Sequence, residues 1–402
     1  MDRDNYAAKA SDYLNTLCSV KPNRRTGSAG NWAATEFFAD TIRPFGYEID
    51  TTPFDVPDHI DEGSSLTAGD KSFEVFTSPY SLGCEMTAEL VMVDTVKALE
   101  SAECRGKILL MRGPICAEQL MPKNFVFYNP EHHQKIIALL ESKKPAAVIT
   151  ATERSPDQVG ALYPFPLLLD GDFDIPSMYC RDDVGDELAK NQGRPAHMRI
   201  NARRLPSKAT NVVATLNRAA EKKVVLTAHI DAYEGTPGAS DNASGTAVLL
   251  LAAEMLADYR GEYALEIAAF NGEDHYSVGG QMDYLRRYGE QLGAIHLAVN
   301  IDDVGYRKGR AAYSFYECPD QLQKAAEGTF SEFDGLCPGE PWFNGDHMIF
   351  VQNGVPCMAM TAEYMPELMR TVTHTALDTP DLVDSAKLVE VAASLNALVK
   401  SV

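Results

Sequence analysis

The sequence predicts an α/β protein with a mainly parallel mixed sheet sandwiched by helices. After residue 205, apolar segments of strand length alternate with segments of helical length, as in KVVLTAHID and the apolar helix expected over residues 243–259. Such alternation is typical of parallel sheets covered on both faces. A second observation concerns residues 59–201, where short strand-like segments of different texture interrupt this pattern.

The first 58 residues belong with the later alternating pattern. Apolar residues at helical spacing cover residues 10–20 and 30–43, Gly46 is placed to end the second helix, and YEIDTTPFDVP is extended. In the interrupting region, strand-like segments such as GKILLMRG and AAVITATE surround one helical segment, HHQKIIALLESKKP. We therefore predict one domain from residues 1–58 and 202–402, with residues 59–201 as a compact, inserted β-rich domain.

The second half completes the predicted sheet. The expected strands are NVVATL, KVVLTAHID, YALEIAAFNGED, AIHLAVNIDDVG and VPCMAMT, and the expected helices include VGGQMDYLRRYG and DHMIFVQNG. The last segment, from Thr379 to the end, predicts a helix with Thr379 as its N-cap and Pro380 at its first position.

Composition excludes some classes of function. The chain has 36 Lys and Arg against 57 Asp and Glu, a formal charge of −21, which argues against binding to nucleic acid or to anionic membranes. Apolar runs stay below the roughly 20 residues that span a bilayer, and the first segment lacks a secretory signal, so we expect a cytoplasmic protein. The eight cysteines form no CxxC pair and are expected to be free and mostly buried.

Acidic residues and histidines gather where the predicted strands end. In open α/β sheets ligands bind at the carboxyl ends of strands, and the polar residues expected at that edge are His229, Asp231, Asp241, Glu273, Asp274, Asp302, Asp303 and His374. Any one of them alone reads as an ordinary loop residue or helix cap. Together, their carboxylates would repel one another unless a divalent cation intervened, and mixed imidazole and carboxylate ligation suits zinc.

The motifs HID, SDNASG, GED, NIDDVG and HTALDT occur in this order, with RRTGSAGNWAATEFF before them and GDHMIFVQNGVP before the last histidine. Over residues 10–57 and 205–402 the sequence thereby resembles the zinc-dependent exopeptidases of clan MH, the family of aminopeptidase Y and glutamate carboxypeptidase II. The resemblance implies the zinc exopeptidase, or phosphorylase/hydrolase-like, fold. The segments CRGKILLMRG, PAAVITATE and IPSMYCRDDVGDEL also resemble the protease-associated domain, an unrelated β-rich insertion being the alternative.

Carried onto this chain, the resemblance implies two zinc ions. His229 and Asp302 would hold the first ion, Asp274 and His374 the second, and Asp241 would bridge them. Glu273 would be the general base, which takes a proton from a metal-bridging water and returns it to the leaving amine. Asp231 would orient His229 by hydrogen-bonding its far nitrogen.

Other assignments are less direct. Asp346 and His347 match the family's S-D-H segment, with Gly345 in place of Ser, and are candidate substrate contacts. Asp378 is a supporting residue near His374 or a structural one. The acidic pair is Glu-Asp where Glu-Glu is commoner, and Asp303 competes with Asp302 as a ligand. His275, next to the acidic pair, is unexpected and is a candidate substrate contact, with an extra ligand or no role as the alternatives. Thr373 stands where some relatives place an oxyanion-stabilising Tyr, so Tyr364 is a replacement proposed on proximity alone.

The sequence therefore predicts a di-zinc exopeptidase acting on peptides, with aminopeptidase as the leading activity. Three alternatives stay open: a carboxypeptidase of the same fold, a single-zinc acyltransferase of the glutaminyl cyclase type, and a non-catalytic binding protein. The basic segment Arg307, Lys308 and Arg310 could serve a carboxypeptidase, although a solvated loop is the simpler interpretation. A dinucleotide site is disfavoured, since no GxGxxG follows a strand.

Overall fold

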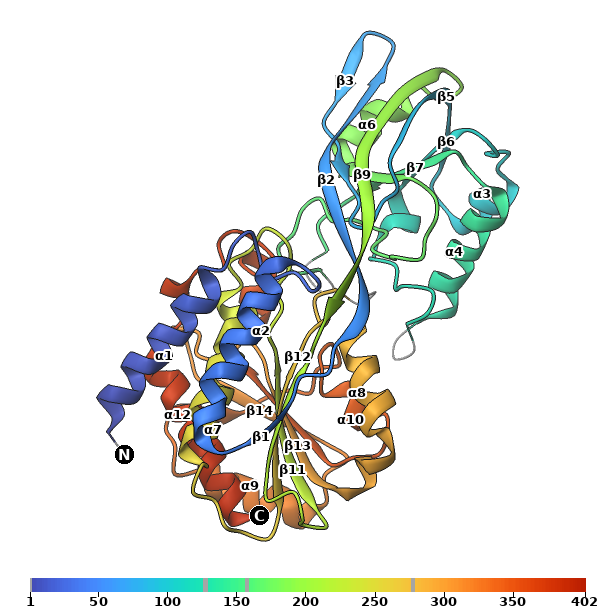
Figure 1. Ribbon diagram of the computed structural model, residues 1–402. Helices are drawn as coiled ribbons and strands as arrows, with labels where there is room; N and C mark the ends of the chain where they lie inside the picture. Colours follow the sequence, from blue (N-terminus) through green and yellow to red (C-terminus); the bar gives the residue numbers. More distant parts are fainter. Residues whose placement is uncertain (1, 126–128, 156–158, 276–278) are drawn as a thin grey trace. The chain divides into compact units, whose positions relative to one another are not determined.

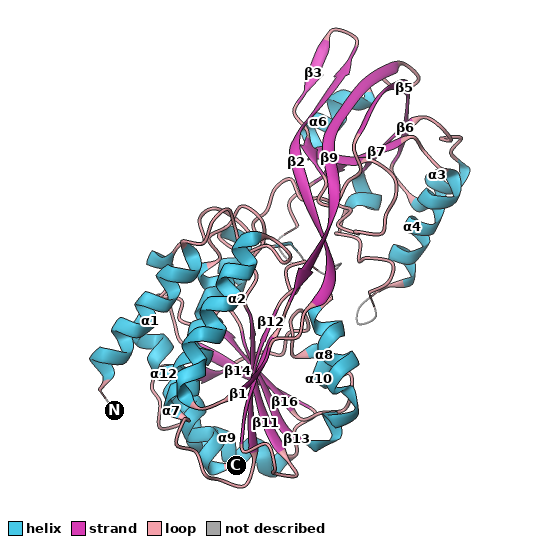
Figure 2. Ribbon diagram, viewed as in Figure 1, coloured by secondary structure: helices cyan, strands magenta, loops and turns pink. Residues whose placement is uncertain are grey.

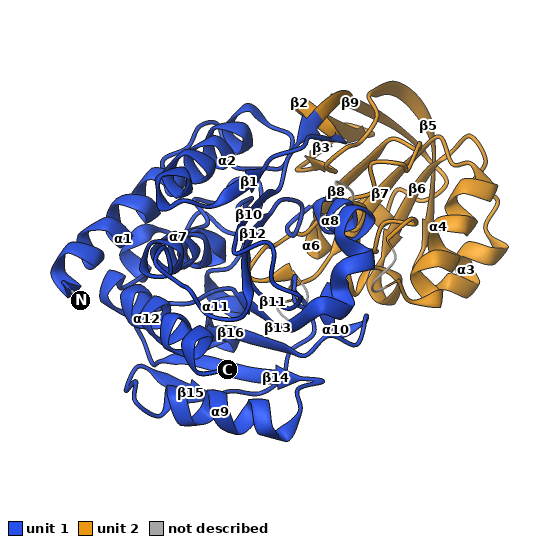
Figure 3. Cartoon of the chain, turned by 60° about the horizontal axis from the view of Figure 1, so that its bottom comes forward, with its two compact units in different colours: residues 1–55, 208–275, 279–402 blue, residues 56–207, 276–278 orange. Residues whose placement is uncertain are grey.

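The computed structural model describes residues 2–125, 129–155, 159–275 and 279–402. The chain divides into two compact units (Figure 3). The first comprises Met1–Asp55, Lys208–His275 and Gly279–Val402, and the second contains Val56–Ser207, against a predicted insertion of residues 59–201. Within the described ranges, no helix is long and apolar enough to cross a membrane.

The first unit is built on an eight-stranded mixed sheet (Figure 2). Its central strands are mutually parallel, and antiparallel strands flank them, which confirms the predicted fold class. The strands, in sheet order, are β1 (Glu48–Asp50), β10 (Val212–Leu216), β12 (Ala264–Phe270), β11 (Lys223–His229), β13 (Ile295–Ile301), β16 (Cys357–Ala362), β14 (Ala311–Tyr316) and β15 (Leu336–Pro338).

Helices cover both faces of this sheet (Figure 1). One face packs against α1 (Arg3–Cys18), α2 (Ala29–Ile42), α7 (Gly245–Met255) and α12 (Ser385–Ser401), and α8 (Gly280–Tyr288) and α10 (Met348–Val351) lie on the other. Alternate residues of β11, including Val224 and Leu226, enter the core beneath α7. The remaining elements are α9 (Asp320–Phe330), α11 (Met365–Thr371) and the 3₁₀ turns Arg43–Phe45, Gly289–Ala294 and Pro380–Leu382.

The predicted start of the last helix is wrong. Pro380 opens only a 3₁₀ turn, and the helix begins at Ser385, where the Asp384 carboxylate accepts the N–H of Ala386 at 2.9 Å. The hydroxyl of Thr379 donates to the nearby Asp381 carboxylate and does not cap the helix. The segment DHMIFVQNG forms only the short α10, and the helix predicted from Val278, a residue outside the described ranges, begins at Gly280.

The second unit has its own eight-stranded sheet and apolar core. In sheet order the strands are β3 (Lys71–Phe73), β2 (Phe54–Ala68), β9 (Pro195–Ala209), β5 (Cys84–Val93), β6 (Ile108–Arg112), β7 (Ala147–Thr152), β8 (Ser177–Arg181) and β4 (Phe76–Thr77). Its helices within the described residues are α3 (Val96–Ser101), α4 (Glu131–Lys143) and α6 (Asp182–Ala189), with a 3₁₀ turn at Gly113–Cys116. Its identity as a protease-associated domain stays a prediction. All eight cysteines of the chain are free, and six are buried.

Candidate metal and catalytic centre

The carboxyl ends of three neighbouring parallel strands bring the predicted site residues together. β11 ends at His229, which pairs in register with Phe270 at the end of β12. The loop after β12 carries Glu273 and Asp274, and Asp302 directly follows β13. Because parallel strands end at one edge of the sheet, residues distant in sequence converge there. All these side chains are buried.

Asp241 lies between the two histidines. Its Oδ1 is 3.2 Å from Nε2 of His229, and its Oδ2 is 3.2 Å from Nε2 of His374. Nε2 of His229 also lies 3.5 Å from Oδ1 of Asp302, and Nε2 of His374 lies 2.9 Å from Oδ1 of Asp274. The structure thus assembles all five predicted metal ligands in two groups that share one carboxylate.

The backbone around Asp241 is held from behind. Asp241 sits in the kinked turn Ala239–Ser244, which leads into α7 and contains a cis peptide bond between Asp241 and Asn242. The Asp378 carboxylate accepts the N–H groups of Ser240 and Asp241 at 2.8 and 3.0 Å. Burial raises the pKa of Asp378 to about 7, although these hydrogen bonds oppose the shift. Asp378 therefore supports the Asp241 turn.

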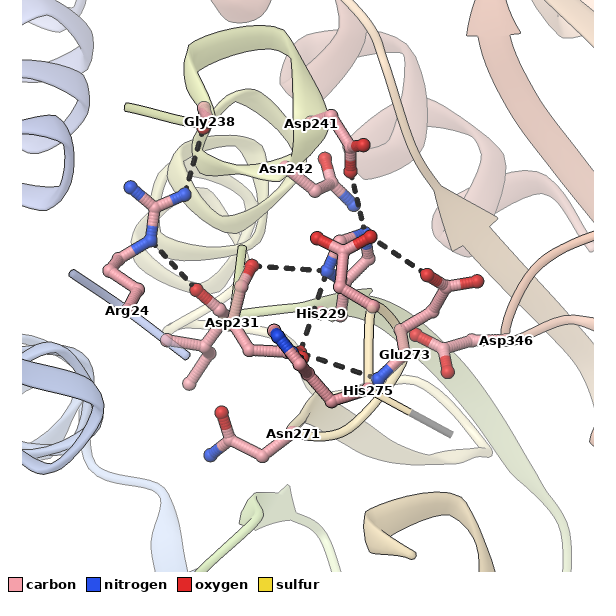
Figure 4. A network of polar contacts seen from close by, with 12 residues as sticks. Arg24, His229, Asp231, Gly238, Asp241, Asn242, Asn271, Glu273, His275 and Asp346 are labelled. Carbon is pink, nitrogen blue, oxygen red and sulfur yellow. Dashed lines mark hydrogen bonds and ion pairs between the residues drawn. The ribbon is translucent and has the colours of Figure 1, made fainter. Parts of the chain in front are cut away.

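Arg24 ties the loop between His229 and Asp241 to the N-terminal segment (Figure 4). Its buried guanidinium donates to the carbonyls of Ile230 at 2.9 Å and Gly238 at 2.8 Å, and also to those of Leu17 and Pro237. Gly238 has φ 61°, and a Cβ there would lie 2.7 Å from Nη2 of Arg24. In the sequence Arg24 is visible only as part of the RRTGS motif, and nothing in that motif predicts these hydrogen bonds.

Asp231 connects three groups of the centre (Figure 4). Its Oδ1 is 3.6 Å from Nδ1 of His229 and accepts the N–H of Glu273 at 3.4 Å. Its Oδ2 is 3.4 Å from Nδ1 of His275. Burial alone would raise the pKa of Asp231, but its hydrogen bonds with the two histidines hold the pKa below its ordinary value. Asp231 thus stays ionised behind both imidazoles.

The centre holds an excess of negative charge. Burial raises the pKa of the Glu273 carboxyl well above its ordinary value, which the charge of His229 opposes and that of Asp274 increases. Burial likewise raises the pKa of Asp302. For His229 and His374, burial alone would lower the pKa, but the surrounding carboxylates raise it well above the ordinary value. Burial of several carboxylates together is therefore the main cause of these shifts, and repulsion among the carboxylates adds to it.

Several buried polar atoms of the centre make no hydrogen bond among the described residues, although some of them lie in ion-pair contact with one another. Nε2 of His229, Oδ2 of Asp274 and Oδ1 of Asp302 are buried and make no hydrogen bond within the part of the chain that the structure describes. Across those same residues, the ion pairs of Asp241, Asp274 and Asp302 involve histidines only. Buried polar groups are normally satisfied, so unsatisfied imidazole and carboxylate atoms that face one another fit divalent cations. One atom from each of His229, Asp241 and Asp274 lies within 4.8 Å of the others.

Asp303 and Asp346 occupy different positions around this cluster. Asp303 accepts the hydroxyl of Ser240 at 2.6 Å, so its carboxylate is engaged behind the turn, whereas Asp302 faces His229. Asp346 is fully buried and accepts Nε2 of Gln281 at 2.6 Å. Burial raises the pKa of Asp346 to about 7.

The remaining predicted substrate contacts are spread out. The ring of His347 is fully buried between Trp342 and Tyr316, and burial lowers its pKa to about 4. This burial favours a packing role, and a substrate contact for His347 stays a prediction. Tyr364 is about half exposed, and its oxyanion role stays a prediction as well.

Tyr233 was not anticipated as part of the centre. Its ring stacks on His374 with centroids 4.7 Å apart and an interplanar angle of 19°, and on His275 at 5.9 Å and 17°. In the sequence this residue is simply the aromatic position of HIDAY, with no chemistry of its own. Its place between two imidazoles arises only when the loops after β11 and β12 meet the loop that carries His374.

Comparisons with known proteins agree with this arrangement. Residues 211–399 match the model of peptidase family M28. The chain is 24% identical over 291 residues to the probable lipoprotein aminopeptidase LpqL of Mycobacterium tuberculosis, covering 69% of this chain and 54% of the relative. It is 23% identical over 313 residues to aminopeptidase YwaD of Bacillus subtilis, covering 74% and 62%. The chain thus spans little more than half the length of these curated relatives.

Solved structures share the fold. An aminopeptidase from Aneurinibacillus sp. strain AM-1 superposes with a TM-score of 0.75 at 21% identity, covering 98% of this chain and 93% of that one. A zinc aminopeptidase from Bacillus subtilis gives 0.76 at 20% identity, covering 98% and 94%. A glutaminyl cyclase from Fimbriiglobus ruber is more distant, with a TM-score of 0.52 at 12% identity over 98% and 95%.

Proposed function

Because residues 211–399 match the model of peptidase family M28, we propose that the chain is a di-zinc aminopeptidase that removes N-terminal residues from peptides. The observation that carries the proposal is the position of Asp241, whose two carboxylate oxygens each face a different histidine at 3.2 Å. A shared carboxylate between two ligand groups is the arrangement that a two-metal site requires.

The residues present fit two zinc ions. His229 and Asp302 would hold the first ion, His374 and Asp274 the second, and Asp241 both. The set is rich in imidazole and carboxylate donors, which suits zinc, and the buried atoms that make no hydrogen bond belong to it. When bound, the ions would supply Lewis acidity, which lowers the pKa of water and polarises the substrate carbonyl.

Glu273 would carry the proton in this reaction. Its Oε2 lies 4.0 Å from Nε2 of His229, at the ligand cluster, and it forms no ion pair with a Lys or Arg across the described residues. It would accept a proton from the attacking water and return it to the leaving amine. The hydrogen bond from its own N–H to Asp231 fixes the backbone that presents it. Asp231 in turn would orient the imidazole of His229.

Three observations weigh on the alternatives. A carboxypeptidase needs cations for the substrate carboxylate, but the basic segment after β13 is engaged elsewhere: Arg307 donates to the Asp381 carbonyl, Lys308 pairs with Glu367, and Arg310 pairs with Glu363. For the single-zinc cyclase, the presence of both ligand groups is the opposing observation. The relatives named aminopeptidases favour the same end of the peptide.

The deciding experiment combines metal content with a substrate panel. Purified protein should contain two zinc ions per chain and should hydrolyse aminoacyl p-nitroanilides but not their N-acetylated counterparts. Chelation should abolish the hydrolysis, and added zinc should restore it. One ion without hydrolysis would favour the cyclase, and hydrolysis of N-blocked peptides from the carboxyl end would favour the carboxypeptidase. Failure to bind any metal would refute the metal centre and favour a non-catalytic binding protein.

Two further assignments remain proposals. We propose that the second unit is a protease-associated domain that limits the length of the substrate, which an unchanged length preference after deletion of residues 60–200 would contradict. A cytoplasmic location stays a prediction from composition, and one curated relative is named as a lipoprotein.

A further inference from the structure

A cavity opens at the edge of the first unit's sheet that also carries the proposed metal centre. It is a cavity of about 350 Å³ at the ends of β14 and β16, and small-molecule sites occupy about 300–1,000 Å³. Its position relative to the metal centre follows from the strand register. Ile301 pairs with Met360, so Asp302 and Thr361 are the next residues of adjacent parallel strands, and Thr361 pairs in turn with Ala312. Neighbouring strands lie about 4.8 Å apart, so the cavity begins one strand from a proposed zinc ligand.

The walls of the cavity are small and mostly apolar. Ala312, Ala362 and Met365 line it together with Pro338 and Pro366. A Cβ at Gly339 would lie 2.8 Å from the Cβ of Ala312. A side chain at position 339 would therefore crowd the wall of the cavity at Ala312. A narrow apolar lining of this kind suits an unbranched alkyl chain more than a large ring.

The polar groups of the cavity carry a net negative charge. Glu340 and Glu363 both line it. Arg310 engages Glu363 through its backbone N–H at 2.9 Å and its guanidinium at 3.2 Å. Glu340 has no hydrogen-bond or ion-pair partner among residues 2–125, 129–155, 159–275 and 279–402. Arg310 and, through space, Lys387 therefore offset the charge of Glu363, whereas the charge of Glu340 stays uncompensated within the described residues.

A hydroxyl group adds a further unfilled polar contact. Thr361 is only 6% exposed and lines the cavity, and its hydroxyl has no partner in the described parts of the chain. Within one cavity there are therefore an uncompensated carboxylate, an unengaged hydroxyl and a narrow apolar lining. A ligand group that satisfies all three has an alkyl stem that ends in a cation.

We propose that this cavity receives the side chain of the substrate's N-terminal residue and selects lysine and arginine. This inference rests on the proposed aminopeptidase function. The alkyl stem would lie against Ala312 and Met365, and the ammonium or guanidinium group would reach Glu340. An acidic residue would be repelled, and a large aromatic residue would be hindered by the wall at Gly339.

The test compares kcat/KM for p-nitroanilides of lysine and norleucine, which share an unbranched four-carbon stem and differ in the terminal ammonium group. Because Glu340 is exposed and exposed ion pairs are weak, we expect a preference for lysine of about twofold to fivefold, which falls as salt is added. Glu340→Gln should remove most of this preference, and Glu340→Lys should reverse it. Glu332→Gln, which removes an equally exposed carboxylate outside the cavity lining, should leave it unchanged.

A size test locates the site independently of charge. Gly339→Leu should lower kcat/KM for lysine and norleucine at least tenfold while the alanine p-nitroanilide is still cleaved, which also shows that the variant folds. Equal or better cleavage of norleucine by the wild type, or a lysine preference that survives Glu340→Gln, would overturn the inference but leave the aminopeptidase intact. Absence of hydrolysis across the panel, together with absence of zinc, would overturn both.

Discussion

Arg24 gives the sharpest prediction for stability, because one buried side chain serves four backbone acceptors. Its guanidinium donates to the carbonyls of Leu17, Ile230, Pro237 and Gly238 at 2.7–3.0 Å. A hydrogen bond to a charged group contributes about 1.5–3 kcal/mol to the free energy of unfolding, and a buried acceptor left without a hydrogen bond costs about 1–3 kcal/mol. Water entering the vacated space will recover part of this, so Arg24→Met should lower the free energy of unfolding by about 4 kcal/mol.

Urea unfolding of the metal-free protein, followed by fluorescence, measures this change without any contribution from bound zinc. Arg43→Met is the matched control, because Arg43 is exposed and, among the residues that the structure describes, forms an ion pair with Asp40 alone. Its loss should cost about 0.5 kcal/mol or less. Arg24→Lys should fall between the two, since an ammonium group cannot reach all four carbonyls. A loss below about 1 kcal/mol for Arg24→Met would refute the view that this side chain holds the loop before Asp241.

The remaining predictions concern the centre itself. Glu273→Gln should retain two zinc ions and lower kcat by about 10²–10⁴-fold; near wild-type turnover would contradict the role of general base. Asp241→Ala should lose both metal and activity, as measured by metal analysis after dialysis, and full zinc occupancy would refute the shared carboxylate. His347 has a pKa of about 4 in the folded protein against about 6.5 when unfolded. The unfolded state therefore takes up the proton first as the pH falls, and stability is lost between about pH 6.5 and 4, by up to about 3 kcal/mol. In urea titrations of metal-free protein at pH 7.5 and 5.5, His347→Leu should show about 1 kcal/mol less pH dependence than the wild type, and equal dependence would count against the buried neutral imidazole.

The parts of the structure that sequence reasoning reached are those with strong local patterns. The strand ending at His229 is a continuous apolar run, as buried parallel strands are. The ordered motifs identify the five proposed ligand residues, which the structure brings together. Asp302 was preferred over Asp303, and the structure directs Asp302 toward His229. These successes depend on short-range patterns that a single segment displays.

The parts that were missed depend on partners far along the chain. The contacts of Arg24 with Ile230 and Gly238 join residues more than 200 positions apart. No local sequence pattern predicts that the Arg24 side chain will hydrogen-bond to these backbone carbonyls. The stacking of Tyr233 on His374 is similar. The error at the last helix has a different cause: Thr379 and Asp384 are both good caps, and the choice between them depended on a side-chain bond from Thr379 to Asp381.

The discontinuity of the first unit has a consequence for how the protein can be made. Its two portions are separated by the insertion between neighbouring strands β2 and β9, and Arg24 precedes the insertion while its partners Ile230 and Gly238 follow it. During synthesis, about 150 residues of the insertion leave the ribosome after the N-terminal helices and before the segments against which those helices pack. A fragment limited to residues 211–399 would lack α1, α2 and Arg24, and should be expressed as an insoluble or protease-sensitive chain.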